Sequence, residues 1–161
     1  MEDTAIVYYS LDGNTDYIAR RIAEKTGAKL IRLETKKAYP RKGFKKFFIG
    51  GRDALFGAEP ELKAPLPDLA PNRNIVIGTP VWASRPAPAI NTFLRRTKID
   101  GKRIALFACS GGGQAETCLN KMEALLTGNE ILCRAAFVNP AFKRGKTVDD
   151  AIDEIVSALS D

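Results

Sequence analysis

The chain has 161 residues, a length that fits one domain. Hydrophobic residues make up 45% and charged residues 27%, a composition typical of a folded globular protein, which excludes a fibrous or low-complexity chain. The chain contains no histidine, which excludes Ser-His-Asp and Cys-His hydrolytic chemistry and argues against a zinc or iron site, so we expect no metal and a borrowed organic cofactor.

Short runs of β-branched and aromatic residues alternate along the chain with segments of helical apolar spacing. The predicted strands are residues 4–9, 28–33, 74–78, 103–108 and 131–138. One predicted helix follows the first strand and ends at Gly27. Three others cover about 86–97, 115–127 and 147–160, and the last of them has a capping pair of Thr147 and Asp150. Because parallel neighbours need crossovers, this order predicts a three-layer α/β sandwich with a five-stranded parallel sheet.

The segment from Thr35 to Arg73 is too long for a plain connection between two strands. We interpret it as a basic insertion at about 35–73 within a single domain of residues 1–161. We expect a helical break at Gly50-Gly51 and an extended portion from 60 to 71. Five residues give one or two helices an apolar side: Phe44, Phe47, Phe48, Leu55 and Phe56.

Ligands of such sheets bind beyond the carboxyl ends of the strands, so the loops after the first, third and fourth strands are candidates. The first loop could hold a phosphate with hydroxyls, an amide and N–H groups at a helix N-terminus. The alternative is a plain turn with an Asn or Thr helix cap. Its residues are Ser10, Leu11, Asp12, Gly13, Asn14 and Thr15.

The other two loops suit a planar ring. The loop after the third strand holds the one tryptophan of the chain and consists of Thr79, Pro80, Val81, Trp82 and Ala83. The loop after the fourth strand offers backbone amides through Ser110, Gly111, Gly112 and Gly113. The alternatives are a half-buried core tryptophan and a flexible turn, but three such loops at one edge favour a binding site.

The chain resembles the flavodoxin-like family of FMN-binding proteins over essentially its whole length. The family's phosphate loop, Ser/Thr-x-Thr-Gly-Asn-Thr, corresponds to residues 10–15, its tryptophan loop to 79–84 and its pyrimidine-binding loop to 110–114. The uninterrupted fifth strand resembles the short-chain branch. The resemblance implies a strand order of 2-1-3-4-5 and a noncovalent FMN held by these three loops.

Three positions depart from the family pattern. Asp12 replaces a threonine, and because a carboxylate repels a phosphate, we expect it to cap the following helix or to contact solvent. The third loop has no aromatic residue from 110 to 117, so we expect one face of the ring to be open. Ala83 stands where many flavodoxins have glycine, and its Cβ should disfavour a positive φ.

The leading functional interpretation is an FMN-binding redox protein that carries electrons between partner proteins or small molecules, with the chemistry on the flavin. The open ring face favours a second interpretation, an NAD(P)H-dependent FMN/quinone oxidoreductase. A third is a flavin-free binding module on the same fold, which Asp12 would explain. We expect a cytoplasmic protein, because acids follow Met1 where a signal peptide needs basic residues and no apolar run could span a bilayer.

The net charge of +6 is concentrated in one segment, and the rest of the chain sums to −1. Between positions 36 and 52 the basic residues are Lys36, Lys37, Arg41, Lys42, Lys45, Lys46 and Arg52, with no acid among them. The segment fits a solvated helical face best and docking of an acidic redox partner next. A third interpretation is contact with nucleic acid or an anionic membrane surface, and of all these nucleic acid fits least well. We therefore expect no nucleic-acid partner and no stable membrane insertion.

Overall fold

The computed structural model describes residues 3–160, apart from the side chains of residues 46 and 47. Five strands pair in parallel in the order β2-β1-β3-β5-β6: β1 (Thr4–Tyr8), β2 (Lys29–Arg32), β3 (Asn74–Trp82), β5 (Arg103–Ser110) and β6 (Glu130–Val138). A two-residue strand that sequence analysis missed, β4 (Arg85–Pro86), pairs antiparallel with the end of β3. The predicted parallel sheet and its strand order are therefore confirmed, with β4 as an addition. The third strand was predicted to end at Gly78, but it continues to Trp82 because its end pairs with β4, so the prediction of a loop at residues 79–82 is wrong.

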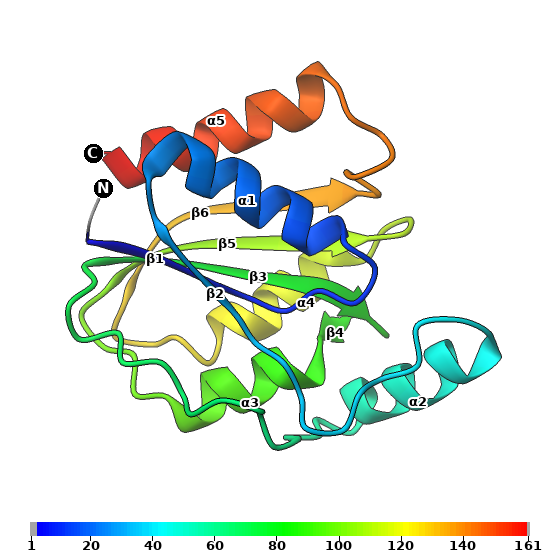
Figure 1. Cartoon of the computed structure of the whole chain (residues 1–161). Coiled ribbons are helices and arrows are strands. Elements are labelled where there is room, and N and C mark those ends of the chain that lie inside the picture. The colour runs from blue at the N-terminus through cyan, green and yellow to red at the C-terminus, as the bar shows by residue number, and fades with distance from the viewer. Residues whose placement is uncertain (1–2, 161) are drawn as a thin grey trace.

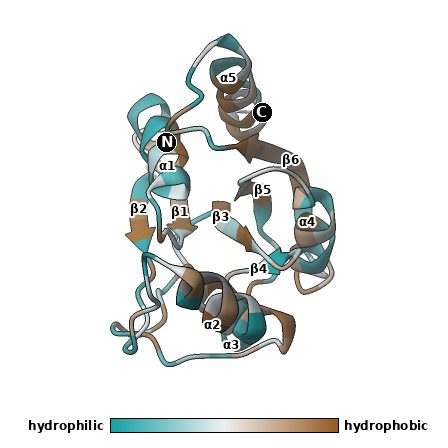
Figure 2. Cartoon of the chain, turned by 90° about the vertical axis from the view of Figure 1, so that its right-hand side faces the viewer, coloured by the Kyte–Doolittle hydropathy of each residue, from teal (hydrophilic) through white to brown (hydrophobic). Residues whose placement is uncertain are grey.

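Helices cover both faces of the sheet (Figure 1). One face packs against α1 (Asn14–Thr26) and α5 (Lys146–Ser160), and the other against α3 (Pro88–Arg96) and α4 (Ala115–Glu123). Figure 2 shows the hydrophobic strands enclosed between these helices. The three layers predicted from the alternation of strands and helices are thus confirmed.

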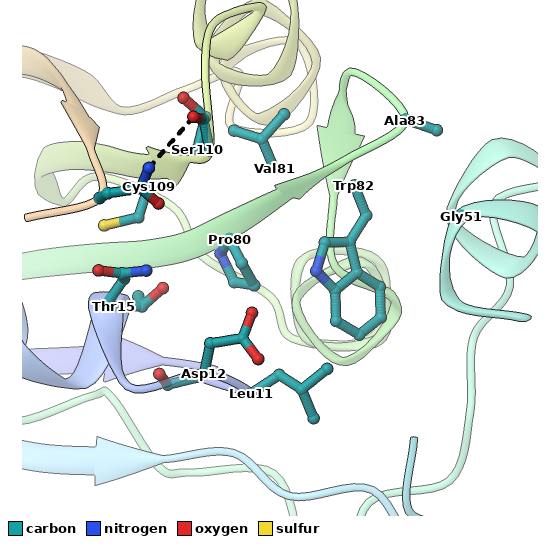
Figure 3. Close-up of a pocket in the computed structure, with 14 residues that line it drawn as sticks. Leu11, Asp12, Thr15, Gly51, Pro80, Val81, Trp82, Ala83, Cys109 and Ser110 are labelled. Carbon is teal, nitrogen blue, oxygen red and sulfur yellow. Dashed lines mark hydrogen bonds between the residues drawn. The ribbon is translucent and has the colours of Figure 1, made fainter. Parts of the chain in front are cut away.

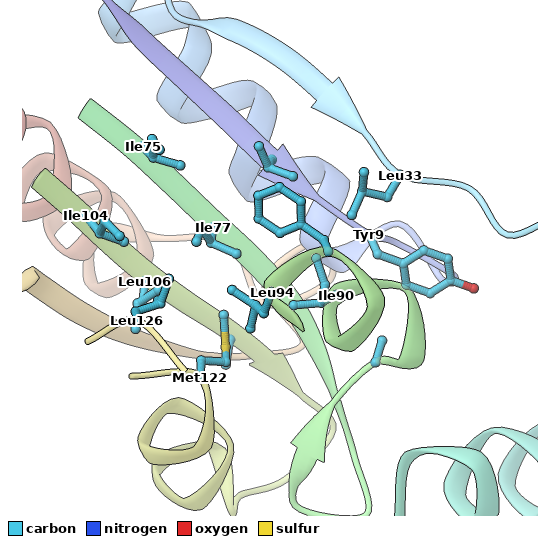
Figure 4. Packing of buried hydrophobic residues seen from close by; sticks show 14 of the residues in the cluster. Tyr9, Leu33, Ile75, Ile77, Ile90, Leu94, Ile104, Leu106, Met122 and Leu126 are labelled. Atoms are coloured by element: carbon cyan, nitrogen blue, oxygen red, sulfur yellow. The ribbon is translucent and has the colours of Figure 1, made fainter. Parts of the chain in front are cut away.

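The central strand β1 explains how one sheet serves two cores. Ala5 and Val7 belong to the core beneath α3 and α4, which Figure 4 shows, whereas Ile6 and Tyr8 belong to the core beneath α1 and α5. All four side chains are almost completely buried. Alternate residues of a strand point to opposite faces, so a strand with no polar alternation is apolar on both sides.

Helix α2 (Phe44–Leu55) lies in the insertion and runs without interruption through Gly50 and Gly51. The expected break at this pair is therefore wrong. Gly50 packs so close to Trp82 that an added Cβ would lie 3.1 Å from the indole ring. The contact holds the helix together where glycine by itself costs about 1 kcal/mol relative to alanine.

Phe44 and Phe48 of α2 do not seal the insertion to the sheet. Phe44 and Phe48 are exposed, and among the helix positions whose side chains the structure describes, the buried ones are the small residues Gly50 and Ala54. The alternative in which Phe44 and Phe48 cover the sheet is therefore wrong, and the Phe47 side chain lies outside the described residues. The portion from 60 to 71 contains no helix and pairs with the start of the insertion through a bridge between Thr35 and Leu62.

Three helices have boundaries that differ from the sequence predictions. Helix α3 begins at Pro88 and not at about 86, because Pro86 belongs to β4. The last helix begins at Lys146, and the Gly145 carbonyl accepts hydrogen bonds from the Val148 and Asp149 amides, so Thr147 lies inside the first turn and the expected capping pair is wrong. Helix α4 ends at Glu123 because the next residues form tighter turns. Among the described helices, none is both long and apolar enough to cross a membrane.

Candidate functional site

A cavity of about 410 Å³ opens at the carboxyl ends of β1, β3 and β5 (Figure 3). Its volume lies within the roughly 300–1,000 Å³ typical of small-molecule sites. Residues from all three predicted loops line it: Ser10, Leu11, Asp12, Asn14, Thr15, Pro80, Val81, Trp82, Ala83, Ser110 and Gly111. Three residues that the sequence analysis did not assign to the site complete the lining: Gly51, Cys109 and Asn139.

The first loop forms an anion-binding turn. The Ser10 hydroxyl accepts a hydrogen bond from the Gly13 amide at 3.2 Å, and Gly13 adopts a left-handed φ of 94°. No side chain caps the start of α1, so the predicted alternative of an Asn or Thr cap is wrong. The first-turn N–H groups of a helix have no partner within the helix, and the positive end of the helix dipole lies there. This turn can therefore hold a phosphate without a cationic side chain.

Thr15 supplies a polar group that lacks a partner. It is buried, it lines the cavity, and its hydroxyl makes no hydrogen bond within the part of the chain that the structure describes. Burial raises the pKa of the adjacent Cys109 thiol to about 12. The nearby Thr15 hydroxyl offsets part of this rise in pKa, but the two groups do not meet at the distance and angle of a hydrogen bond. A buried hydroxyl with no partner costs free energy, so a ligand oxygen in the cavity would satisfy it.

Two neighbours of Thr15 behave differently from the sequence expectation. The side-chain oxygen of Asn14 accepts a hydrogen bond from the Ala141 amide at 3.0 Å, which ties the loop to the connection after β6 and leaves the amide nitrogen as the donor. Asp12 is exposed to solvent, as expected, and it also lines the cavity. Its carboxylate faces the space between Pro80 and Trp82 (Figure 3).

The third loop repeats the geometry of the first. The Ser110 hydroxyl accepts a hydrogen bond from the Gly113 amide at 3.1 Å, and no side chain caps the start of α4. Two helix N-termini therefore follow the strand ends that border the cavity. Gly112 and Gly113 are exposed and belong to this turn but do not line the cavity.

Trp82 is held in place by other aromatic rings. Its indole makes edge contacts with Tyr9 at 5.8 Å and with Tyr39 at 5.2 Å between ring centroids. Burial raises the pKa of Tyr9 to about 12, and burial together with a hydrogen bond to Asp53 raises that of Tyr39, so both rings stay neutral. The tryptophan is half-buried beside α2 and lines the cavity.

The turn after Trp82 is tight and left-handed. Ala83 and Ser84 have φ values of 48° and 61°, and they connect β3 to β4. Ala83 therefore adopts a positive φ that its Cβ makes costly, and pairing of β3 with β4 offsets that cost. Thr79 is fully buried and its hydroxyl accepts a hydrogen bond from the Ala87 amide at 2.9 Å, so it supports this turn and does not line the cavity.

The three residues missed by the sequence analysis come from segments that the fold brings to the cavity. Asn139 follows β6, and its side chain donates a hydrogen bond to the Gly111 carbonyl at 3.2 Å. Cys109 is the last residue but one of β5, and Gly51 belongs to α2. The one sequence signal for Asn139 is its position directly after the last strand, β6, at the carboxyl edge of the sheet. No sequence signal indicated that α2 reaches the site.

Charged residues brace the first loop from below. The Arg32 guanidinium donates a hydrogen bond to the Ser10 carbonyl at 3.1 Å and lies 3.5 Å from Asp16. Burial by itself would raise the pKa of Asp16, but hydrogen bonds from Arg20 and Tyr8, with the charges of both arginines, outweigh it and lower that pKa. Asp16 is therefore ionised at neutral pH, and its charge holds the Arg32 guanidinium that contacts the loop.

Fold and site together define a class of protein. In this doubly wound parallel sheet the strand order reverses between β1 and β3, and at that point an uncapped helix N-terminus lies beside a tryptophan. The flavodoxin family profile matches residues 3–154. The chain therefore belongs to the flavodoxin family.

Solved structures share the fold. A flavoprotein from Lactobacillus acidophilus NCFM, solved in complex with FMN, is 24% identical with a TM-score of 0.73 over 91% of this chain and 100% of its own. A protein of Bacteroides uniformis that is assigned as a flavoprotein is 21% identical with a TM-score of 0.77, covering 96% and 97%. A flavodoxin of Streptococcus pneumoniae TIGR4 is 16% identical with a TM-score of 0.61, covering 98% and 97%. No curated protein sequence matches the chain.

Proposed function

We propose that this flavodoxin binds FMN noncovalently in the cavity and transfers electrons in the cytoplasm. FMN is the cofactor that family membership and the FMN complex of the Lactobacillus relative support. The observation that carries the proposal is the buried Thr15 hydroxyl, which lacks a hydrogen-bond partner in the described residues and lines a cavity at an uncapped helix N-terminus. That arrangement fits a phosphate better than a neutral ligand.

The chain's own residues bind and orient the cofactor. The amides at the start of α1, the Thr15 hydroxyl and the Asn14 amide nitrogen would hold the phosphate. Trp82, fixed by two tyrosine rings, would cover one face of the isoalloxazine, and the Ser110–Gly111 backbone would meet its pyrimidine edge. When bound, the flavin supplies the electron or hydride chemistry.

A second candidate function is NAD(P)H-dependent reduction of a quinone. Among the residues that line the cavity, Trp82 is the one aromatic, and the loop from 110 to 113 contributes glycine and serine. Such a lining leaves room for a nicotinamide on the ring face opposite the tryptophan. In this alternative NAD(P)H is the donor and a quinone the acceptor, whereas an electron carrier would use a redox partner protein. Steady-state NADH and NADPH oxidation with a soluble quinone separates the two.

The experiment compares two isosteric substitutions, Thr15→Val and Thr97→Val. Both remove a buried hydroxyl that has no hydrogen-bond partner in the described residues, but Thr97 lies at the end of α3, outside the cavity. Isothermal titration of the flavin-free protein with FMN and with riboflavin gives the affinities. A hydrogen bond to a charged group contributes about 1.5–3 kcal/mol, so Thr15→Val should weaken FMN at least tenfold and riboflavin far less.

Thr97→Val should change neither affinity, and neither substitution should lower the thermal stability of the flavin-free protein, because no hydrogen bond is lost. Equal losses for FMN and riboflavin in Thr15→Val would refute the phosphate assignment. A colourless protein that takes up no FMN would point to a flavin-free binding module on the same fold.

A further inference from the structure

Helix α2 carries an apolar stripe that faces away from the protein. Phe44, Phe48 and Leu55 are 80%, 60% and 51% exposed. At 3.6 residues per turn these positions lie within about 40° of one another around the helix. The two phenylalanine rings stack with centroids 6.1 Å apart, and Phe56, just beyond the helix, is 81% exposed. The stripe is therefore an unpartnered apolar surface.

Basic residues border this stripe. On the helix surface, Lys45 and Arg52 lie within about 60° of the edge of the stripe, and both are exposed. Lys42, just before the helix, is exposed as well. The first acid after the basic run, Asp53, is half-buried and receives a hydrogen bond from the Tyr39 hydroxyl at 3.0 Å. The stripe therefore has cations beside it.

The connection between β6 and α5 repeats the same composition. Phe142 is 81% exposed and is followed by exposed Lys143 and Arg144. The Arg144 guanidinium lies 4.9 Å above the Tyr17 ring, and the Ala141 amide is held by Asn14. An exposed phenylalanine with cations beside it thus recurs on a second, structurally fixed segment.

Both segments lie at the edge of the sheet where the cavity opens. Gly51 of α2 and Asn139, which follows β6, each line the cavity. Figure 1 shows both segments on the right-hand side of the molecule, and Figure 2 views that side directly, with α2 below the strand ends and the β6–α5 connection above them. We call this surface the aromatic-basic edge: Lys42, Phe44, Lys45, Phe48, Arg52, Leu55, Phe56, Phe142, Lys143 and Arg144.

We propose that the aromatic-basic edge docks the protein reversibly on an anionic membrane surface, with the cavity mouth turned toward the lipid. Phenylalanine and leucine on one helix face beside lysine and arginine are the composition of helices that lie in the interface of anionic bilayers. The cations are drawn to the negative headgroups, and the rings enter the boundary between headgroups and acyl chains.

Other occupants fit less well. A second copy joined through the same face would bring the cations of both copies together, because a two-fold interface is self-complementary. Protein interfaces are depleted of lysine at their centre, whereas this edge places lysines next to its exposed rings. A uniformly negative lipid surface matches a segment with no acid from position 36 to position 52.

The experiment measures co-sedimentation of the FMN-loaded protein with vesicles of phosphatidylcholine alone and of phosphatidylcholine with phosphatidylglycerol. Two double variants alter the edge, Phe44→Ser/Phe48→Ser and Lys42→Gln/Lys45→Gln. The matched control, Lys29→Gln/Lys98→Gln, removes the same charge from exposed positions at the opposite edge of the sheet. Because all these side chains are exposed, we expect the variants to fold, and retained FMN binding verifies it.

Binding should require phosphatidylglycerol and weaken with added salt, which screens exposed charges. Each edge variant should lower the bound fraction at least fivefold, and the control pair should not. Four results would overturn the proposal: no binding by the unaltered protein, an equal loss in the control pair, no loss in the phenylalanine variant, or a protein dimer in solution that the phenylalanine variant abolishes. The flavin-free protein carries the same edge and can be assayed in the same way, so the membrane proposal and the FMN proposal fail separately.

Discussion

The adjacent glycines of α2 allow a direct test of how Trp82 is held. An alanine Cβ at Gly51 would meet nothing within 4 Å, whereas at Gly50 it would lie 3.1 Å from two carbons of the Trp82 ring. In a helix, alanine is more stable than glycine by about 1 kcal/mol at either position. At Gly50 the ring would have to move, but Tyr9 and Tyr39 pack against it, and overpacking costs about 1–3 kcal/mol.

We therefore expect Gly51→Ala to raise the Tm of the flavin-free protein by about 2–4 °C per kcal/mol gained. Gly50→Ala should leave the Tm unchanged or lower it. Trp82 is the one tryptophan of the chain, so its fluorescence emission reports the packing, and it should shift in Gly50→Ala alone. Equal rises in Tm with an unchanged emission spectrum would refute the packing argument.

Three further predictions concern the core, the turn and pH. Gly78→Ala would place a Cβ 2.1 Å from the fully buried Phe107 ring, so urea unfolding should show a loss of about 1–3 kcal/mol, and an unchanged midpoint would contradict this packing. A left-handed conformation costs a residue with a Cβ roughly 1–2 kcal/mol, and Ala83→Gly removes that cost. The Tm should therefore rise despite the added freedom of the unfolded chain, and a fall would show that Ala83 is not strained. Burial, with a hydrogen bond to Asp16, raises the pKa of Tyr8 from 10.0 to about 12, so its contribution to stability is complete below pH 10 and is lost as the pH rises toward 12. Tyr8→Phe should flatten the fall in unfolding free energy over that range, and an unaltered slope would exclude Tyr8 as its source.

The sequence by itself determined the layers, the parallel sheet and the edge at which the cavity lies. Strands with apolar residues on both faces, separated by helical segments, leave few arrangements that bury both faces. Ser10 lies just beyond β1 and Trp82 ends β3, so the two residues meet at the carboxyl edge of the sheet in any arrangement of that class.

Only the tertiary structure decided the remaining features of the site. Whether α2 continues through Gly50 and Gly51 depends on the contact with Trp82, which is distant in sequence. The missing partner of the Thr15 hydroxyl and the reach of Asn139 depend on how β5, β6 and α1 approach one another. These are long-range packing contacts, and local sequence patterns carry no information about them, because periodicity fixes which face a residue occupies and not what it meets there.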